Sequence, residues 1–475
     1  MDFARDRRLL LPVAGLCSAA LFYFGTGLAP VAALTWLAPL PVLLVAARTS
    51  GRVAAGLAFG ACLLGMTNSW PFFAGSHDVP LWPWGLMVTV GMALTFALAV
   101  VLFRTLLLHG RTLLAVTTAP AAWVAVLYVV ASFNPTGIMG TLANTQADVP
   151  IVVQAASVTG AWGVEYLVLF VPVAVAALVT RRDVRVAVFT GVVLAVVVAG
   201  GAVRLAQDDE PAQRVALVAG NGHGWAADLD TPAGPELLAA YAREIAALPD
   251  GVRTVVLPEA VFGAHEARPA LLVDTMTALA RAEGVDIVVG YAQWTDGAKY
   301  NYALTFLASG GDPVPYLKHH DMVSPPGHDL ALLPAAGVLI CGDVNHRNPS
   351  ADYATAGARL LAIPASNEDD NGWQHSRIAL LRGVESGVAV AWGGRQTRLM
   401  VSDDRGRVVA EASSGGAGAF TTVVADVPMG NRATPYARLG DWFAWLCVGL
   451  TLAALFVIGY QRKLRIKGRS AARSG

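Results

Sequence analysis

Three residues of this 475-residue chain could together carry out an acyl transfer. Glu259, Lys318 and Cys341 each follow a short apolar run, and catalytic side chains are commonly presented on loops beyond rigid strands. A cysteine is an effective nucleophile only as a thiolate; a nearby cation lowers its pKa, and a carboxylate can accept its proton. The set therefore predicts Glu259 as general base, Lys318 as the group that stabilises the developing oxyanion, and Cys341 as the nucleophile that carries the acyl group.

Residue types alone leave a simpler interpretation open. A lone cysteine at a strand end is commonly a small buried hydrophobic residue, and a single glutamate or lysine is commonly a surface charge. The cysteines of the chain are Cys17, Cys62, Cys341 and Cys447. No pair has C-x-x-C spacing, and no histidines have the spacing of H-E-x-x-H. We therefore expect neither a disulfide framework nor a metal site.

The region 213–428 has the pattern of an α/β domain, because short runs rich in valine and isoleucine alternate with helical patterns. The predicted strands are 214–218, 254–257, 286–290, 302–307, 338–340, 360–363, 388–392, 399–402 and 420–427. The predicted helices are 234–247, 269–283 and 375–386. Glu259 and Cys341 come directly after two of these strands.

The chain as a whole is too apolar for a soluble protein. Hydrophobic residues make up 55% and charged residues 14% of the sequence, whereas soluble domains have about 25% charged residues. Stretches near the roughly 20 residues needed to cross a bilayer as a helix recur along the chain. They are 9–24, 28–46, 53–67, 82–103, 113–131, 164–179, 186–203 and 442–460. The sequence thus predicts a polytopic membrane protein with about eight transmembrane helices, seven of them before the α/β domain.

This pattern divides the chain into four parts. They are an N-terminal membrane domain (1–206), a catalytic domain (207–438), a C-terminal transmembrane helix (439–461) and a basic cytoplasmic tail (462–475). The first apolar run is expected to stay as a membrane helix and not to be cleaved as a signal peptide, because further membrane segments follow at once.

The distribution of basic residues predicts how the chain is oriented in the membrane. Arginine and lysine gather at the N-terminus, in every second short loop and in the tail, while the alternate loops near 25–27, 68–81 and 132–162 contain neither. Because basic short loops stay in the cytoplasm, both termini are expected inside and the α/β domain on the extracytoplasmic face of the plasma membrane. The formal net charge of zero is a cancellation: residues 208–441 hold 17 basic and 28 acidic residues, and the remainder holds 17 and 6.

The motifs around the three candidate residues resemble those of a known superfamily. They are Leu257-Pro258-Glu259, Tyr316-Leu317-Lys318-His319-His320 and Leu339-Ile340-Cys341-Gly342-Asp343. In this order within one α/β domain, they resemble the Glu-Lys-Cys signature of the nitrilase superfamily. The resemblance implies an αββα sandwich, with Glu259, Lys318 and Cys341 as the catalytic set.

The membrane helices narrow the resemblance to one branch, the apolipoprotein N-acyltransferases. Further stretches resemble this branch: 154–163, Ser366-Asn367 followed by Gly372-Trp373-Gln374-His375, and Thr434-Pro435-Tyr436-Ala437-Arg438-Leu439-Gly440-Asp441. The resemblance implies that Cys341 takes an acyl chain from a phospholipid as a thioester. The α-amino group of the diacylglyceryl-cysteine of an apolipoprotein then accepts the chain. Phospholipid, apolipoprotein and membrane lipid are thus the implied partners, and nucleic acid is not. The implied reaction needs no metal and no organic cofactor.

Some positions depart from the family pattern. Only 23 positions separate Lys318 from Cys341, where the family has a longer arm with a supporting Gly-Glu. His328 or Asp329 is a candidate replacement for that glutamate. Gly342, Asp343, Asn367 and Trp373 are further candidates for supporting residues.

These departures keep two other functions open. One is a membrane-tethered amidase or other nitrilase-like hydrolase, in which water resolves the thioester. The other is a catalytically silent scaffold with the same fold.

Overall fold

The computed structural model describes residues 3–76, 79–208, 210–222, 224–366, 371–430 and 432–474, with side chains described between 9 and 460. The chain forms two compact units. One consists of Met1–Ser132, Trp162–Val198 and Asp441–Gly475, and the other of Phe133–Ala161 and Ala199–Gly440. The second unit thus includes a segment of 29 residues that precedes the α/β domain in the sequence by about 50 positions.

The first unit is helical. Its helices are α1 (Phe3–Gly25), α2 (Ala32–Leu37), α3 (Leu40–Ala46), α4 (Gly51–Gly65), α5 (Trp70–Gly75), α6 (Leu86–Leu108), α7 (Thr112–Phe133), α10 (Ala161–Arg181), α11 (Val184–Leu205) and α17 (Trp442–Ser474), of which α7, α10 and α11 cross its boundary. Helical segments long and apolar enough to cross a membrane are Gly51–Gly75, Leu81–Leu108, Thr112–Phe133, Ala161–Arg181, Val184–Leu205 and Trp442–Tyr460. The chain is therefore a membrane protein, and its apolar helices come before and after the α/β domain in the sequence.

The described residues contain six such segments, whereas the sequence pattern predicts about eight. The first predicted span lies in α1, and Leu9–Gly25 is the apolar portion of this helix whose side chains are described. The second predicted span is divided into α2 and α3, with Pro39 at the start of α3. Proline cannot donate the backbone hydrogen bond that a continuous helix needs at this point.

The second unit contains two β-sheets. The larger sheet has β1 (Ala212–Gly220), β2 (Ala227–Asp228), β3 (Val252–Val256), β4 (Phe262–Ala264), β5 (Asp286–Thr295), β6 (Ala298–Phe306), β7 (Val314–Leu317) and β13 (Phe420–Pro428). Its order is β13-β1-β3-β5-β4-β2, and β6 pairs with β5 and β7. The smaller sheet has the order β12 (Val408–Ser413), β11 (Arg398–Ser402), β10 (Ala389–Arg395), β9 (Leu360–Ser366) and β8 (Ala336–Val338).

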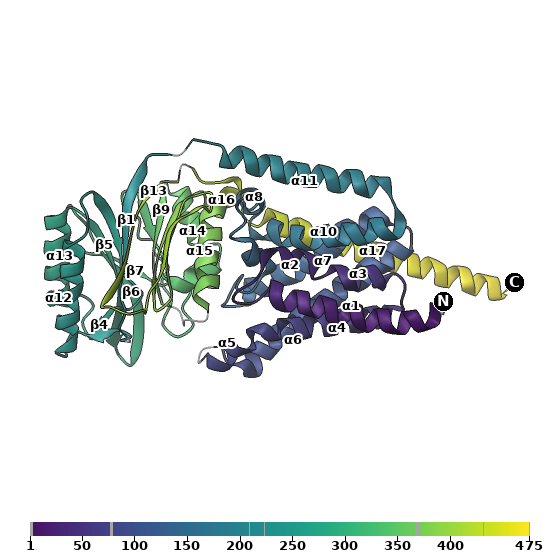
Figure 1. The fold of residues 1–475 in the computed structure, drawn as a ribbon, viewed down its shortest axis with the longest axis horizontal. Coiled ribbons are helices and arrows are strands. Elements are labelled where there is room, and N and C mark those ends of the chain that lie inside the picture. The colour runs from purple at the N-terminus through teal and green to yellow at the C-terminus, as the bar shows by residue number, and fades with distance from the viewer. Residues whose placement is uncertain are drawn as a thin grey trace. The chain divides into compact units, whose positions relative to one another are not determined.

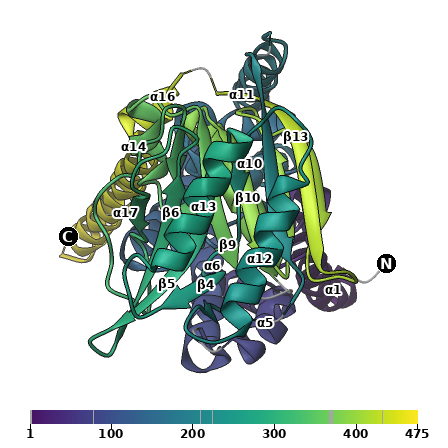
Figure 2. The same cartoon turned by 90° about the vertical axis from the view of Figure 1, so that its left-hand side faces the viewer.

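Helices cover the outer faces of the two sheets. Helices α12 (Ala233–Ala246) and α13 (Ala270–Glu283) lie on the larger sheet (Figures 1 and 2). Helices α14 (Ser350–Thr355) and α15 (Gly372–Ser386) lie on the smaller sheet, and β1 and β5 of one sheet pack against β10 and β9 of the other. This αββα arrangement confirms the predicted architecture. Each of the nine predicted strands overlaps an observed one.

Parallel pairing brings the ends of several strands to one edge. Strands β1, β3 and β5 are mutually parallel neighbours, as are β8, β9 and β10. The loops after β3 and β8 therefore leave at the carboxyl edge of their sheets. Glu259 lies in the first of these loops and Cys341 in the second.

Strand β5 passes directly behind the loop that carries Glu259. A Cβ atom at Gly290 would lie 2.5 Å from Ala260 N and 2.6 Å from Glu259 Cα, and closer still to Pro258 O. Real Cβ atoms do not approach backbone this closely, so glycine is needed at this position.

We predict that Gly290→Ala displaces the Glu259 loop and destabilises the domain by about 1–3 kcal/mol, the usual cost of overpacking. The midpoint of thermal unfolding of the purified full-length protein should fall. Gly416→Ala is the matched control, since a Cβ there meets no atom within 4 Å. Equal midpoints for the two variants would contradict the prediction.

Candidate active site

The structure brings Glu259, Lys318 and Cys341 together. The Lys318 ammonium donates to Glu259 Oε1 at 2.8 Å, and the charges of both residues act on the Cys341 thiol. Cys341 Sγ lies 3.5 Å from the carbonyl oxygen of Ser366. The side chains of Glu259 and Lys318 are 3% and 13% exposed. Glu259 and Lys318 follow strands of the larger sheet, whereas Cys341 follows β8 of the smaller sheet. The packing of the two sheets therefore assembles the set.

Asn301, on β6, organises the carboxylate side of this cluster. Its Nδ2 donates to Glu259 Oε1 at 2.7 Å and lies 3.3 Å from Asp321 Oδ2. Its backbone carbonyl accepts from the Lys318 N–H at 3.0 Å. Asn301 thus contacts both charged members of the set, and the sequence pattern alone did not indicate it.

Cys341 lies in a strained turn. Its φ of +40° places it in the left-handed region, which costs a residue other than glycine roughly 1–2 kcal/mol. A 3₁₀ turn, Cys341–Asn345, begins at this residue. The conformation turns the chain sharply after β8.

Asp343 holds this turn in place. Its Oδ2 accepts from the Tyr316 hydroxyl at 2.7 Å and from Ile340 N at 3.0 Å, and its Oδ1 accepts from His320 N at 2.7 Å. The carboxylate is fully buried. It therefore connects the turn that carries Cys341 to the strand and loop that carry Lys318. Gly342 lies beside the same lysine, since a Cβ there would be 3.8 Å from Lys318 Cε.

Burial and the charge of Glu259 oppose ionisation of the Cys341 thiol. Burial raises the pKa of Cys341, the negative charge of Glu259 raises it further, and Lys318 offsets only part of the effect. For Lys318, burial lowers the pKa, but the charges of Glu259 and the neighbouring acidic groups raise it above its ordinary value. At rest and neutral pH the lysine is therefore charged and the thiol is protonated. Cys341 consequently needs a base when it reacts.

A second carboxylate lies near the lysine, and it is Asp321. Burial would raise the pKa of Asp321, but Lys318 and the backbone N–H groups of Ser324 and Val323 hold it below its ordinary value. The structure does not bring His328 and Asp329 to this place. Both are exposed, and the recorded contact of Asp329 is its carbonyl, 3.1 Å from His319 Nε2. Asp321 follows Lys318 by three positions, so proximity in sequence was the available signal.

His375 lies against the sulfur of Cys341. Its Nδ1 is 3.9 Å from Cys341 Sγ, and its ring centroid is 5.1 Å from that of Trp392 on β10. Burial, aided by the charge of Lys318, lowers the pKa of His375 to about 3, so the imidazole is neutral. Trp373, two positions earlier on α15, contacts Asp148. Asn367 lies outside the described residues.

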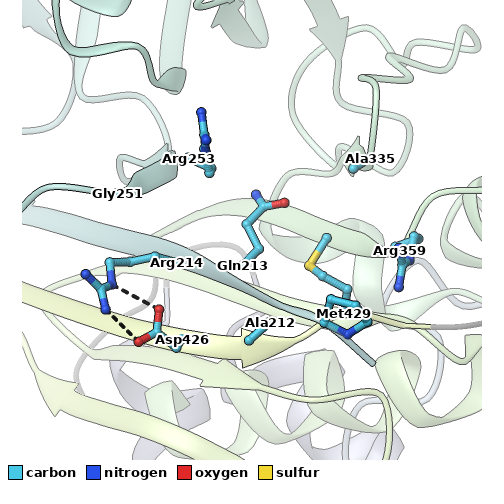
Figure 3. A pocket seen from close by; sticks show the side chains of 10 residues that line it. Ala212, Gln213, Arg214, Gly251, Arg253, Ala335, Arg359, Asp426 and Met429 are labelled. Atoms are coloured by element: carbon cyan, nitrogen blue, oxygen red, sulfur yellow. Dashed lines mark hydrogen bonds and ion pairs between the residues drawn. The ribbon is translucent and has the colours of Figure 1, made fainter. Parts of the chain in front are cut away.

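A cavity of about 430 Å³ lies at the opposite end of the strands (Figure 3). Its lining includes Arg214, Arg253, Arg359 and Asp426. Arg214 is engaged by Asp426 through two bonds of 2.9 and 2.8 Å, and Arg359 lies 3.3 Å from Glu210. The three guanidinium groups diverge in Figure 3, so they do not form a common anion site. Within the described ranges, no cluster of three or more His, Cys, Asp and Glu side chains is arranged to hold a metal.

Two family profiles match different parts of the chain. The family profile described as apolipoprotein N-acyltransferase N-terminal domain matches residues 18–174, and the carbon-nitrogen hydrolase profile matches residues 214–434. A protein of Geobacter metallireducens named apolipoprotein N-acyltransferase is 26% identical over 530 residues, with 97% of each chain covered.

Two solved structures of the nitrilase superfamily are similar to part of the chain. Nit3 of Saccharomyces cerevisiae, a member of branch 10, is 20% identical with a TM-score of 0.39, covering 46% of this chain and 91% of its own. A cysteine-to-alanine mutant of the Nesterenkonia AN1 amidase is 19% identical with a TM-score of 0.36, covering 46% of this chain and 92% of its own.

We predict that Asp343→Asn destabilises the turn at Cys341 by about 2–3 kcal/mol. An amide offers one acceptor oxygen where the carboxylate serves three donors, and its NH₂ group would face a donor. Tyr316→Phe removes only one of these bonds and should cost about 1 kcal/mol. Thermal unfolding of both variants checks the order, and a larger loss for Tyr316→Phe would contradict it.

The opposing effects of Glu259 and Lys318 predict the pH dependence of Cys341 alkylation by a small reagent such as iodoacetamide. Only the thiolate reacts, so the rate should rise with pH and have its midpoint above that of an ordinary cysteine. Glu259→Gln removes a negative charge and should move the midpoint to lower pH. Lys318→Met removes a positive charge and should move it to higher pH. Shifts of the opposite sign would contradict the assigned electrostatics.

Proposed function

The chain belongs to the apolipoprotein N-acyltransferase family, and on that premise we propose the reaction that its site performs. The protein is an acyltransferase of lipoprotein N-acylation. It takes an acyl chain from a phospholipid onto Cys341 and passes it to the α-amino group of the diacylglyceryl-cysteine of an apolipoprotein. The observation that carries the proposal is the buried ion pair between Lys318 and Glu259, whose two charges both act on the Cys341 thiol.

The first half-reaction forms a thioester. Glu259 accepts the thiol proton while Cys341 Sγ attacks the carbonyl carbon of the phospholipid ester. The bond between that carbon and the glycerol oxygen then breaks. The leaving oxygen takes the proton back from Glu259, and a lysophospholipid departs. The raised pKa of the thiol supports this role of Glu259, because the sulfur does not ionise unaided.

The second half-reaction forms an amide. The α-amino nitrogen of the acceptor attacks the thioester carbonyl, and Glu259 accepts a proton from this nitrogen. The carbon–sulfur bond breaks, and the proton passes to the sulfur, which restores the resting thiol. In both halves, negative charge develops on the carbonyl oxygen. The Lys318 ammonium and the backbone N–H of Gly342 would stabilise this charge. The exclusion of water from the buried site would strengthen their effect.

The membrane helices help the catalytic domain to meet its two substrates. Donor and acceptor are both anchored in a bilayer, and a domain tethered by helices at both of its ends meets them in two dimensions. Tethering raises their effective concentration without any new contact. In the proposed topology both termini are cytoplasmic and the catalytic domain, 207–438, faces the extracytoplasmic side of the plasma membrane.

We expect purified protein to move a radiolabelled acyl chain from phospholipid to the amine of a diacylated lipopeptide, and Cys341→Ser to lose this transfer by at least about a thousandfold. The magnitude follows from losing the covalent intermediate. Thermal unfolding of Cys341→Ser, which should match the wild type, controls for folding. Label released only as free fatty acid would indicate a hydrolase, and transfer by Cys341→Ser would refute the thioester route.

A further inference from the structure

The segment between α7 and α10 is part of the unit that holds the catalytic residues. It contains the 3₁₀ turn Leu142–Gln146, α8 (Pro150–Val153) and α9 (Ala156–Thr159). Ile138 N donates to Asn345 O at 3.0 Å, in the turn that begins at Cys341. Gln154 Nε2 donates to Arg405 O at 2.8 Å. The segment itself lies outside the range that matches the carbon-nitrogen hydrolase profile, which begins at residue 214.

Asp148 is the charged residue of this segment that contacts helix α15. Its Oδ2 accepts from the indole N–H of Trp373 at 3.2 Å, and its Oδ1 accepts from Arg377 Nε at 2.7 Å. Positions 373 and 377 are four apart, so they lie on the same face of the helix. One carboxylate therefore holds two successive turns at the start of α15.

Arg377 completes the attachment. Its two terminal nitrogens donate to Glu411 on β12 at 2.7 and 3.1 Å, and its guanidinium lies 5.6 Å from the ring centroid of Trp373. The Arg377 side chain is only 6% exposed, whereas those of Asp148 and Glu411 are 45% and 20% exposed. Glu411 thus satisfies the terminal nitrogens of the arginine, whereas Asp148 joins the arginine to Trp373 on the preceding turn of α15.

The helix held in this way contacts the nucleophile. His375 lies between Trp373 and Arg377 in the sequence, and its Nδ1 is 3.9 Å from Cys341 Sγ. Farther along α15, Arg382 donates to Val344 O at 2.8 Å and Asn345 O at 3.0 Å, both in the turn after Cys341. The orientation of α15 thus determines how tightly His375 covers the sulfur.

We propose that Asp148 is a positioning residue of the active site: it fixes the start of α15 so that the His375 ring packs on the Cys341 sulfur. The segment between α7 and α10 thereby completes the catalytic site of a domain that lies much later in the sequence. The proposal deepens the acyl transfer proposed above and rests on it for its consequence in catalysis. Its structural part concerns only the burial of the sulfur.

Asp148→Asn tests this role. Asparagine puts an NH₂ donor against either the indole N–H or the guanidinium, so one of the two bonds is lost. If α15 loosens, water reaches the thiol, and the burial that raises its pKa is reduced. The midpoint of the pH profile of Cys341 alkylation by iodoacetamide should fall by at least half a pH unit in the full-length protein. Acylation of Cys341 by phospholipid should slow about tenfold.

Glu411→Gln is the matched control. Glu411 contacts the same arginine but not Trp373, so a general loss of stability would affect both variants alike. We expect its alkylation midpoint to stay within 0.2 pH units of the wild type. Trp373→Phe provides a second variant that keeps the ring beneath Arg377 but removes the N–H donated to Asp148. It should move the midpoint in the same direction as Asp148→Asn.

Two outcomes would overturn the proposal. One is an unchanged midpoint in both Asp148→Asn and Trp373→Phe, and the other is an equal shift in Glu411→Gln. Alkylation requires no lipid substrate, so its result is independent of the proposed function. If the variants show the expected shifts but the wild-type protein transfers no acyl chain, the proposed function is refuted and the positioning role stands.

Discussion

The buried ion pair between Lys318 and Glu259 is the interaction on which the site depends. A carboxylate or an ammonium alone in the interior would cost several kcal/mol, so neither charge can remain there without the other. Their 2.8 Å contact requires the ends of β3 and β7 to stay together. Asn301, on the neighbouring β6, satisfies a further acceptor site of the carboxylate. The same pair then sets the chemistry of the sulfur, since the two charges act on the thiol in opposite directions.

Much of the catalytic domain could be predicted from the sequence, because its strands are apolar runs and its helices have clear periodicity. The elements that escaped prediction are short or exposed. Strand β2 has two residues, β4 has three, and β12 is a largely solvent-accessible strand at the end of its sheet. Such segments bury too little surface to leave a hydrophobic pattern. Their pairing is decided by the strands beside them.

The grouping of Glu259, Lys318 and Cys341 was predictable from strand ends together with a family resemblance, but its surroundings were not. The choice between Asp321 and Asp329 depends on how the loop after Lys318 folds back, and both residues satisfy a purely sequential criterion. Asn301 lies within a strand and has no motif of its own. His375 and Asp148 are 227 positions apart in the sequence, and both act through α15, so only the folded chain relates them.

The claim that Cys341 carries the acyl chain as a thioester can be tested most directly by mass spectrometry of the protein itself. Full-length protein incubated with a phospholipid of a single acyl composition, without acceptor, should gain the mass of one acyl chain on the peptide that contains Cys341. Addition of a diacylated lipopeptide should discharge this adduct and place the same chain on the peptide amine. An adduct on a different residue, or acylation of the lipopeptide by protein that never carries an adduct at Cys341, would contradict the proposed mechanism.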